Sequence, residues 1–408
     1  MKNILSIVLA GGQGERLKPL TNERAKPAVP FGGHYRIIDF VLSNLVNSGL
    51  MRILILTQFK SDSLLRHLKR GWHVPPLMDQ FIDAVPAQMR TGNHWYKGSA
   101  DAVYQNLHHI TNTKSDTVCI FGGDHIYRMN IRHMLNFHAS KNADVTVAVI
   151  PCPLAEASSF GIVTADSEWR IADFKEKPEK PDAMPGSTTH ALCSMGIYIF
   201  KAEVLADAIT KDASEANSAH DFGRNIIPSL YKTKKILAYN FMDNPVPGAK
   251  NEEGGYWRDV GSIDSYWHSS MDLVSVSPIF NLYNRDWPIH TTLETHPPAK
   301  FVFADKETDR VGMATDSLVS NGCIISGARI NRSILSPGVR VNSFCQIDES
   351  IIFDNVNIGR YSKIRRAIID KDVIIPPNTT IGYDLDEDKK RYTVSPEGVV
   401  VIPKKTTI

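Results

Sequence analysis

The stretch Ser6-Ile7-Val8-Leu9-Ala10-Gly11-Gly12-Gln13-Gly14-Glu15-Arg16-Leu17 decides the fold of this chain. The continuous apolar run from Ile4 to Ala10 predicts a buried strand, and glycines follow it directly. Glycine has no Cβ, so backbone amides in such a loop can approach a polyanion closely. Arg16 can then pair with phosphate oxygens, and Lys26 offers a second cation. The stretch therefore predicts a phosphate-binding loop, with a tight turn flanked by surface cations as the alternative.

Two well-known glycine motifs do not match this loop. A dinucleotide-binding fingerprint needs a third glycine where Leu17 stands. A P-loop needs Gly-Lys-Ser/Thr, which this stretch lacks. If the loop binds phosphate, it belongs to a different class.

Length and composition limit the possible classes of protein. The chain has 408 residues, which is too many for one ordinary core and favours two domains. Hydrophobic residues make up 42% and charged residues 22%, as in ordinary globular proteins. The formal net charge of +2 gives no broad basic field, so we expect no nucleic-acid partner.

The cysteines and the N-terminal sequence suggest a compartment. The chain has five cysteines, an odd number, and no Cys-x-x-Cys pair. Four of them stand in apolar, strand-like surroundings, which predicts buried reduced thiols. No signal peptide precedes the first strand, and no apolar run approaches the about 20 residues of a membrane span. We expect a cytoplasmic protein without a membrane partner.

Residues 1–286 alternate strand and helix patterns. Strands are expected at 4–10, 53–57, 117–121 and 144–150. Helices are expected at 37–46, at 100–110 with Ser99 as N-cap, and after Asn130 as N-cap. Such βαβ alternation predicts an α/β domain with a mainly parallel sheet, whose ligands lie at the carboxyl ends of the strands.

The pattern changes beyond residue 286. Residues 287–300 are rich in proline and predict a linker. Residues 301–408 hold a repeat of 17 residues, in which aliphatic positions fall 6, 5 and 6 apart. The repeated positions are Ile324, Val341, Ile358 and Ile375, then Ile330, Ile347, Ile364 and Ile381, then Leu335, Ile352 and Ile369. This spacing predicts a parallel β-helix rather than a β-sandwich.

Two aspartates could hold a cation beside the loop. The run Val118-Cys119-Ile120-Phe121-Gly122-Gly123-Asp124-His125 ends a buried strand with an acid at the ligand-binding edge. Asp259, in Tyr256-Trp257-Arg258-Asp259-Val260-Gly261, is a second acid among aromatic and apolar residues. Burying an ionised acid costs free energy unless it is paired or bound to a metal ion. Both aspartates are therefore candidate Mg²⁺ ligands. A surface turn at Asp124 and a capping or salt-bridged Asp259 remain the alternatives.

Two further segments are less specific. Asp173-Phe174-Lys175-Glu176-Lys177-Pro178 alone would be a charged loop. Leu192-Cys193-Ser194-Met195-Gly196-Ile197-Tyr198 alone would be core packing. The chain has neither a His-Glu-x-x-His zinc motif nor a Gly-x-Ser-x-Gly nucleophile elbow.

Taken in order, these motifs resemble those of the sugar-1-phosphate nucleotidyltransferases, and most closely the bacterial glucose-1-phosphate adenylyltransferase group. The discriminating segments are residues 26–33, 35–40, 86–90, 95–102 and 220–223. The resemblance runs nearly end to end. It implies a Rossmann-like catalytic domain of the GT-A type followed by a left-handed parallel β-helix.

The resemblance also implies roles for individual residues. Arg16, Asp124 and Lys177 would be catalytic, and Asp124 and Asp259 would bind Mg²⁺. The nucleotide would bind at Leu9, Ala10, Gly11, Gly12, Gly14, Arg16, Lys26 and Gln88. The sugar phosphate would bind at Tyr96, Gly161, Glu176, Lys177 and Ser194.

The implied reaction joins ATP and α-D-glucose 1-phosphate into ADP-glucose and pyrophosphate, for glycogen or related glucan synthesis. The family is typically homotetrameric and regulated by small molecules bound between the domains. Arg24, Arg36, Arg365 and Arg366 are the candidate effector ligands. Glu23 and Pro30 replace a lysine and a histidine that help to bind a sugar-bisphosphate activator in the better-known enteric pattern. Since Glu23 should repel a dianion, the effector stays open.

Three other functions are alternatives. A guanylyl- or uridylyltransferase differs only in base choice, which spacing alone does not decide. An acyltransferase on the β-helix lacks the usual general base, because no histidine occurs between Phe301 and Ile408. A non-catalytic regulatory subunit predicts loss of the acids and cations that this chain retains.

Overall fold

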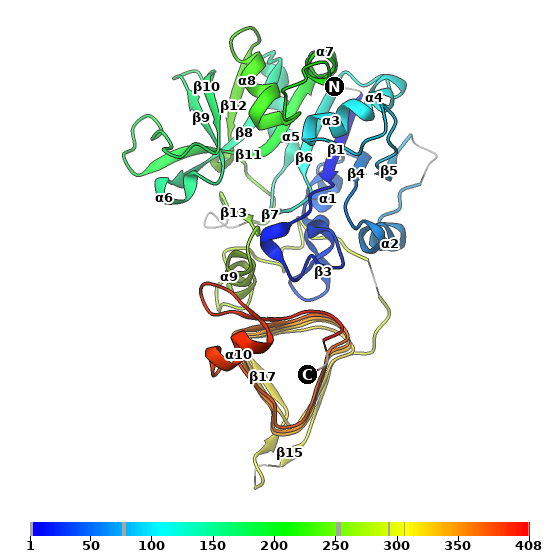
Figure 1. The fold of residues 1–408 in the computed structure, drawn as a ribbon, viewed down its shortest axis with the longest axis vertical. Coiled ribbons are helices and arrows are strands. Elements are labelled where there is room, and N and C mark those ends of the chain that lie inside the picture. Colours follow the sequence, from blue (N-terminus) through cyan, green and yellow to red (C-terminus); the bar gives the residue numbers. More distant parts are fainter. Residues whose placement is uncertain (1–2, 76–78, 250–253, 293, 306, 407) are drawn as a thin grey trace.

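The protein forms two parts joined through an apolar interface (Figure 1). The computed structural model describes residues 3–75, 79–249, 254–292, 294–305, 307–406 and 408. In Figure 1, helices flank a twisted sheet in the upper part, whereas the lower part has a triangular outline. The helix α9 (Ile263–Leu273) lies between the two parts.

A mixed sheet forms the centre of the first part, with nine strands among the described residues. Its main path runs through β10 (Ile171–Glu176), β9 (Gly161–Ala165), β11 (His190–Lys201), β6 (Thr117–Gly122), β1 (Ile4–Ala10), β4 (Arg52–Thr57) and β5 (Phe81–Pro86). Off this path, β8 (Val145–Pro153) pairs with β11 and with β12 (Ile236–Asn240). The first strand β1 pairs in parallel with both β4 and β6, as the βαβ pattern predicted. However, β11 runs antiparallel to β6, β8 and β9, so the sheet is mixed and not mainly parallel as expected.

The continuous apolar runs are explained by burial on both faces of this sheet. Successive side chains of a strand point to opposite faces. Accordingly Ile7 belongs to one apolar cluster and Val8 to another, and both are fully buried. Helices cover both faces: α1 (Ile37–Asn47), α2 (Asp62–Gly71), α3 (Ser99–Gln105), α4 (Leu107–Asn112), α5 (Ile131–Ser140), α6 (Leu154–Ala157), α7 (Ala202–Ala213) and α8 (Ile227–Leu230).

One predicted helix differs in the structure. The expected helix at 100–110 is two helices, α3 and α4, which meet at Asn106. Ser99 is the first residue of α3 and does not cap it. Its hydroxyl donates instead to Asp221 Oδ2 at 2.8 Å. Asn130 does cap α5, because its side chain accepts from the backbone N–H of Arg132 at 3.1 Å.

The second part is a parallel β-helix. Its three faces are the sheets β14-β19-β22-β25-β28, β17-β20-β23-β26-β29 and β18-β21-β24-β27-β31-β30. The strands run from β14 (Lys300–Val302) to β31 (Val400–Ile402), and α10 (Leu385–Arg391) precedes the last pair. The short strands on these faces are β17 (Met313–Thr315), β18 (Leu318–Val319), β19 (Ile324–Ser326), β20 (Arg329–Asn331), β21 (Ile334–Leu335), β22 (Arg340–Val341), β23 (Gln346–Asp348), β24 (Ile351–Ile352), β25 (Asn357–Ile358), β26 (Lys363–Arg365), β27 (Ala367–Ile369), β28 (Ile374–Ile375), β29 (Thr380–Ile381) and β30 (Thr393–Val394).

The stacking register confirms the repeat except at one position. Ile347 pairs with Ile330 below and Ile364 above, as a 17-residue period requires. However, Val341 stacks on Ile325, and the predicted Ile324 faces Arg340. Ile325 is fully buried and Ile324 is only partly buried. The prediction of Ile324 was wrong because this coil is one residue shorter, and a shift by one residue reverses the face of a strand.

The first part of the predicted linker, residues 287–291, lies beside α1. The Asn47 side chain donates to the carbonyl of Pro288 at 2.8 Å, and Thr291 Oγ1 donates to the buried Asp39 carboxylate at 2.7 Å. The strand β14 begins at Lys300, at the end of this segment. The domain boundaries 1–286, 287–300 and 301–408 stay a proposal.

The cysteines differ in part from the prediction. Cys119, Cys323 and Cys345 are free and buried, as expected. The structure joins Cys152 of β8 to Cys193 of β11 in a disulfide, so these two are not reduced thiols. The two strands are neighbours in the sheet, which sequence spacing alone could not reveal. Within the described residues, no helix is both long and apolar enough to cross a membrane.

Candidate active site

The glycine-rich loop joins β1 to a short 3-10 helix, η1 (Glu15–Leu17), which carries Arg16. Gly14 has φ 66°, a left-handed conformation that favours glycine. A Cβ at Gly14 would lie 3.0 Å from Cβ of Lys26. The loop therefore packs directly against the residue that carries the second predicted cation.

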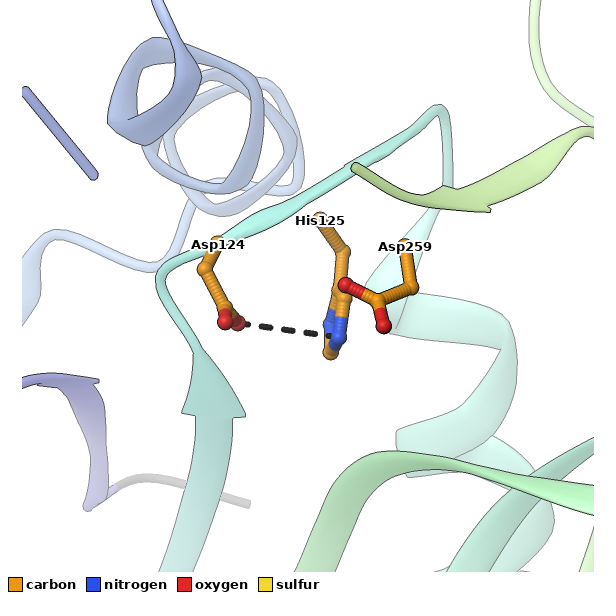
Figure 2. Close-up of side chains that lie close together, drawn as sticks. All are labelled: Asp124, His125 and Asp259. Atoms are coloured by element: carbon orange, nitrogen blue, oxygen red, sulfur yellow. Dashed lines mark ion pairs between the residues drawn. The ribbon is translucent and has the colours of Figure 1, made fainter. Parts of the chain in front are cut away.

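Backbone pairing brings the two predicted acids together. Asp124 follows β6, and Asp259 ends β13 (Trp257–Asp259). The strand β13 runs antiparallel to β7 (His125–Tyr127), with Asp259 opposite His125. Figure 2 shows the side chains of Asp124, His125 and Asp259 gathered in one space, and ligand atoms of all three lie within 4.8 Å of one another.

Lys26 lies between the two carboxylates. Its Nζ donates to Asp124 Oδ2 at 3.1 Å and to Asp259 Oδ1 at 2.8 Å, and its side chain is 7% exposed. Burial alone would lower the pKa of Lys26, but the charges of the two carboxylates raise it. Burial alone would likewise raise the pKa of Asp124, but the charge and hydrogen bond of Lys26 hold it well below its usual range. Asp124 is therefore ionised, and the two carboxylates share one buried cation.

Arg16 completes the charged cluster from the mouth of the site. Its Nη2 lies 3.6 Å from Asp259 Oδ2, and its side chain is 66% exposed. An exposed guanidinium is free to turn toward an incoming phosphate with two parallel donors. Arg16 and Lys26 thus flank the acids from the outside and from the inside.

The donor set of this cluster fits a divalent cation. The two aspartates supply carboxylate oxygens, the ligands that hard ions such as Mg²⁺ prefer. Their arrangement around Lys26 Nζ shows that they face one shared position of positive charge. His125 offers a nitrogen, which suits Mg²⁺ less well, and its ring packs against Trp257 at 5.0 Å between ring centroids.

The predicted sugar-phosphate residues lie on the other side of the same space. A Cβ at Gly161 would lie 2.7 Å from Phe174 Cζ and 2.8 Å from Glu176 Oε2, so a larger residue would force these side chains to move. Burial and then the charge of Asp221 raise the pKa of Glu176. Lys177 Nζ lies 3.9 Å from Glu176 Oε1 and is 52% exposed, which leaves it accessible to an anion. Tyr96, whose hydroxyl accepts from Asn106 Nδ2 at 2.9 Å, faces the same region.

A single cleft of about 640 Å³ collects most of the predicted residues. The predicted residues that line it are Leu9, Gly11, Gly12, Gly14, Arg16, Lys26, Tyr96, Asp124, Gly161, Glu176, Lys177, Ser194 and Asp259. Ala10 and Gln88 are not among the described residues that line it. Ala10 is buried within β1, and Gln88 follows the end of β5. Their predicted contacts with a nucleotide stay predictions.

Sequence reasoning missed several lining residues. Gln58 lines the cleft, accepts from the Tyr96 N–H at 2.7 Å and thereby holds that segment. Asp221 caps η4 (Phe222–Ile226) and also accepts from Ser99. Phe160 and Trp257 add aromatic surface, with ring centroids 5.1 Å apart. The run 220–223 stands out in the sequence only through its family resemblance, and no local pattern marks Gln58.

The four candidate effector arginines lie in two places. Arg24 pairs with Asp370, and Arg36 donates to Ser63 Oγ at 2.9 Å. The positive charges of Arg24 and Arg36 repel one another. Arg366 instead covers the Trp267 ring at 4.3 Å, and Arg365 belongs to β26.

Comparison with known protein families agrees with this geometry. The family model described as "Nucleotidyl transferase" matches residues 5–276, which include the whole charged cluster. The chain belongs to the nucleotidyl transferase family. A second model, described as "GlmU-like, C-terminal hexapeptide", matches residues 297–402. Both halves of the predicted fold class, the Rossmann-like domain and the left-handed β-helix of hexapeptide type, are thereby confirmed.

Curated relatives in this nucleotidyl transferase family are similar over their full length. A "Glucose-1-phosphate adenylyltransferase" of Anaeromyxobacter sp. (strain Fw109-5) is 55% identical over 99% of this chain and 98% of its own. "Glucose-1-phosphate adenylyltransferase 1" of Vibrio vulnificus (strain YJ016) is 51% identical, and the Parafrankia sp. (strain EAN1pec) enzyme is 50% identical, with the same coverage. The resemblance seen in the motifs is confirmed.

Proposed function

We propose that this nucleotidyltransferase transfers the adenylyl group of ATP to α-D-glucose 1-phosphate, giving ADP-glucose and pyrophosphate for glycogen or related glucan synthesis. The observation that carries the proposal is the pair Asp124 and Asp259, which share Lys26 directly beside the glycine-rich loop. Full-length similarity to glucose-1-phosphate adenylyltransferases supports the choice of substrates.

The transfer needs no protein nucleophile. A phosphate oxygen of glucose 1-phosphate attacks the α-phosphorus of ATP, and a new P–O bond forms. The bond from the α-phosphorus to the oxygen bridging to the β-phosphorus breaks, and pyrophosphate leaves with that oxygen. Arg16 binds the leaving phosphates from the mouth of the cleft, and Lys177 holds the phosphate of the sugar. Placing the reacting groups side by side and neutralising their charge lowers the barrier.

Mg²⁺ is the proposed cofactor, with Asp124 and Asp259 as its ligands. When bound, it would neutralise charge on the nucleotide phosphates. Lys26 is bound to both acids in the present structure, and it could then turn its ammonium group toward the phosphates. Before the substrate arrives, Lys26 keeps the two acids together.

The sugar end of the cleft recognises hydroxyl groups rather than charge. Glu176 and Asp221 are acceptors for sugar hydroxyls, and the raised pKa of Glu176 follows from burial and from Asp221. Tyr96 and Ser194 border the same space. Gly161 leaves room for a ring against Glu176, because any larger residue would contact that carboxylate.

Measurement of pyrophosphate release tests the proposal. We expect release from ATP plus glucose 1-phosphate with Mg²⁺, and loss of release with EDTA. UTP, GTP and dTTP in place of ATP test base selectivity, and omission of glucose 1-phosphate controls for hydrolysis. Faster release with UTP or GTP than with ATP would contradict the adenylyl assignment and favour one of the related transferases.

Regulation by small-molecule anions is a second part of the proposal. A cleft of about 590 Å³ between the two parts is lined by Arg36 and Lys371, which could bind an anion. Glu23, which should repel one, is paired with Lys405 at 3.0 Å. We expect sugar phosphates, pyruvate or AMP to change the rate, and Arg36→Gln to reduce that change. No response to any of them would contradict regulation at this cleft.

The assembly and compartment also stay proposals. We expect a homotetramer, as in the family, and a cytoplasmic location, where ATP and sugar phosphates are available. Light scattering after size-exclusion chromatography measures the assembly, and a mass near 45.5 kDa, that of one chain, would contradict it.

A further inference from the structure

A buried ion pair joins the β-helix to the segment that precedes Lys26. Arg24 Nη2 donates to both carboxylate oxygens of Asp370, at 2.9 and 3.0 Å. The side chains are 5% and 3% exposed, and the two residues are 346 positions apart in the chain. The free energy lost when two charges leave water is about as large as the free energy gained when they pair. A buried ion pair is therefore weak evidence for stability, and it can serve another purpose.

Arg24 is two residues from the cation at the catalytic acids. Two residues span at most about 7 Å of chain, so Arg24 and Lys26 lie close together on one segment. Between them, the Ala25 N–H donates to the carbonyl of Lys60 at 3.2 Å, and Ala25 is the N-cap of η2 (Lys26–Ala28). Lys26 then reaches Asp124 and Asp259 with its buried ammonium group.

The same segment also touches the glycine-rich loop. Thr21 Oγ1 donates to the carbonyl of Gly14 at 2.9 Å, and the Lys26 stem packs on Gly14. Residues 21–26 therefore link three places: the phosphate-binding loop, the catalytic acids and the β-helix.

Asp370 is a rigid anchor. It directly follows β27 in the stacked coils, and its N–H donates to the carbonyl of Ile402 at 2.9 Å. Its Oδ1 also accepts from the backbone N–H of Lys371 at 2.7 Å. The carboxylate is thus fixed by the β-helix backbone before Arg24 binds to it.

We propose that Asp370 is a positioning residue for the nucleotidyl transfer site, because it holds Arg24 and so fixes the segment that presents Lys26 to Asp124 and Asp259. The inference rests on the proposed function, since its readout is the transfer reaction. It gives the β-helix a direct part in the chemistry of the other domain, and it gives Arg24 a role different from effector binding.

A second ion pair between the same two parts offers a matched control. Glu23, next to Arg24, pairs with Lys405 at 3.0 Å, but the side chains are 51% and 68% exposed. Exposed pairs contribute little, because water screens them. Lys405→Gln removes an ion pair at the neighbouring position without disturbing a buried anchor.

The first test is Asp370→Asn, which keeps the shape of the side chain and removes its charge. We expect kcat for ADP-glucose formation to fall about ten- to a hundredfold, as for misplacement of a catalytic group, with KM for glucose 1-phosphate within about twofold. Lys405→Gln should stay within about twofold of the unchanged protein in both constants. If the unchanged protein is active and Asp370→Asn has the same kcat, the inference is overturned. If the unchanged protein itself is inactive, the proposed function is overturned instead.

The second test asks whether Asp370 acts through Lys26. In a Lys26→Gln background, Asp370→Asn should cause no further loss of kcat, because the group that it positions is gone. An equal loss in both backgrounds would show a general structural effect and overturn the positioning role.

The third test guards against misfolding of Asp370→Asn, which leaves the Arg24 charge buried. Arg24→Met with Asp370→Asn removes both charges, a change that buried pairs often tolerate. We expect this double variant to fold, by circular dichroism, and to show the same loss of kcat. A folded double variant with normal kcat overturns the inference, and so does failure of both variants to fold, since the pair would then serve stability alone.

Discussion

The two parts of this molecule bury polar groups in different ways. The nucleotidyl transferase part buries charged side chains such as Lys26 and Asp39, each beside a partner distant in the chain. The β-helix buries mainly aliphatic ladders and serines, and its buried Asp370 finds its partner in the other part. Neighbouring repeats are therefore enough to build the β-helix, whereas the catalytic cleft depends on contacts between distant segments.

The largest effect on the catalytic side is expected from Asp124→Asn. The substitution removes one of the two charges around Lys26 and a candidate metal ligand. We expect kcat to fall about a thousandfold, as for loss of a preorganised electrostatic group, with the fold intact by circular dichroism. Asp173→Asn is the matched control, because Asp173 is 38% exposed and Asp124 is 37% exposed. Turnover like that of the unchanged protein would remove Asp124 from the catalytic centre.

On the β-helix side, Ile325→Ala should act on stability instead. Ile325 is fully buried and stacks under Val341, so truncation should cost about 2 to 4 kcal/mol of unfolding free energy. Ile324→Ala, at the adjacent position that faces outward, should cost less than about 1 kcal/mol. Urea titration of both variants measures the difference. Equal losses would contradict the observed register of this coil.

The contribution of histidines to the pH dependence of stability should come from outside the β-helix, because the chain has no histidine beyond His296. His138 is buried, and its Nδ1 lies 2.8 Å from Thr146 Oγ1. Burial, with a smaller contribution from Lys201 and against the opposing charge of Asp144, lowers the pKa of His138 from 6.5 to about 4.

The sign of this effect follows from the proton count. Between pH 6.5 and 4 the unfolded chain binds a proton at His138 and the folded chain does not, so stability is complete above pH 6.5 and falls as the pH drops toward 4. The loss should be about 2 to 3 kcal/mol over this window. Urea midpoints of the unchanged protein and His138→Gln at pH 7 and 5 measure it. An equal decrease in both proteins would exclude His138 as the source.

The smallest effect is expected from Lys177→Gln, which tests the outer wall of the cleft. Loss of one exposed cation should raise KM for glucose 1-phosphate about tenfold, with little change in kcat. A tenfold change corresponds to about 1.4 kcal/mol of binding free energy. Lys175→Gln is the matched control, because Lys175 is 50% exposed and pairs with Asp182 at 2.6 Å outside the cleft. An unchanged KM in Lys177→Gln would contradict its role.

Much of the site could be predicted because its residues occur in compact local motifs. A few neighbouring residues are enough to predict three features: the strand before Gly11, the acid after Gly122 and Gly123, and the acid after Trp257. The exceptions were residues whose roles depend on distant partners. Ser99 binds Asp221 rather than its own helix, and Gln58 holds Tyr96. Cys152 meets Cys193 only because β8 and β11 are neighbours.

The sequence by itself determined the alternation of strands and helices, the glycine-rich loop and the 17-residue repeat, because all three follow from local spacing of apolar residues and glycine. Only the tertiary structure decided that Lys26 bridges Asp124 and Asp259, that Ile325 rather than Ile324 faces inward, and that Arg24 meets Asp370. For the charges, the physical reason is that a charge is buried only where a partner meets it, and these partners are distant in the chain. For Ile325, the reason is that a coil one residue shorter reverses the face that the strand turns inward.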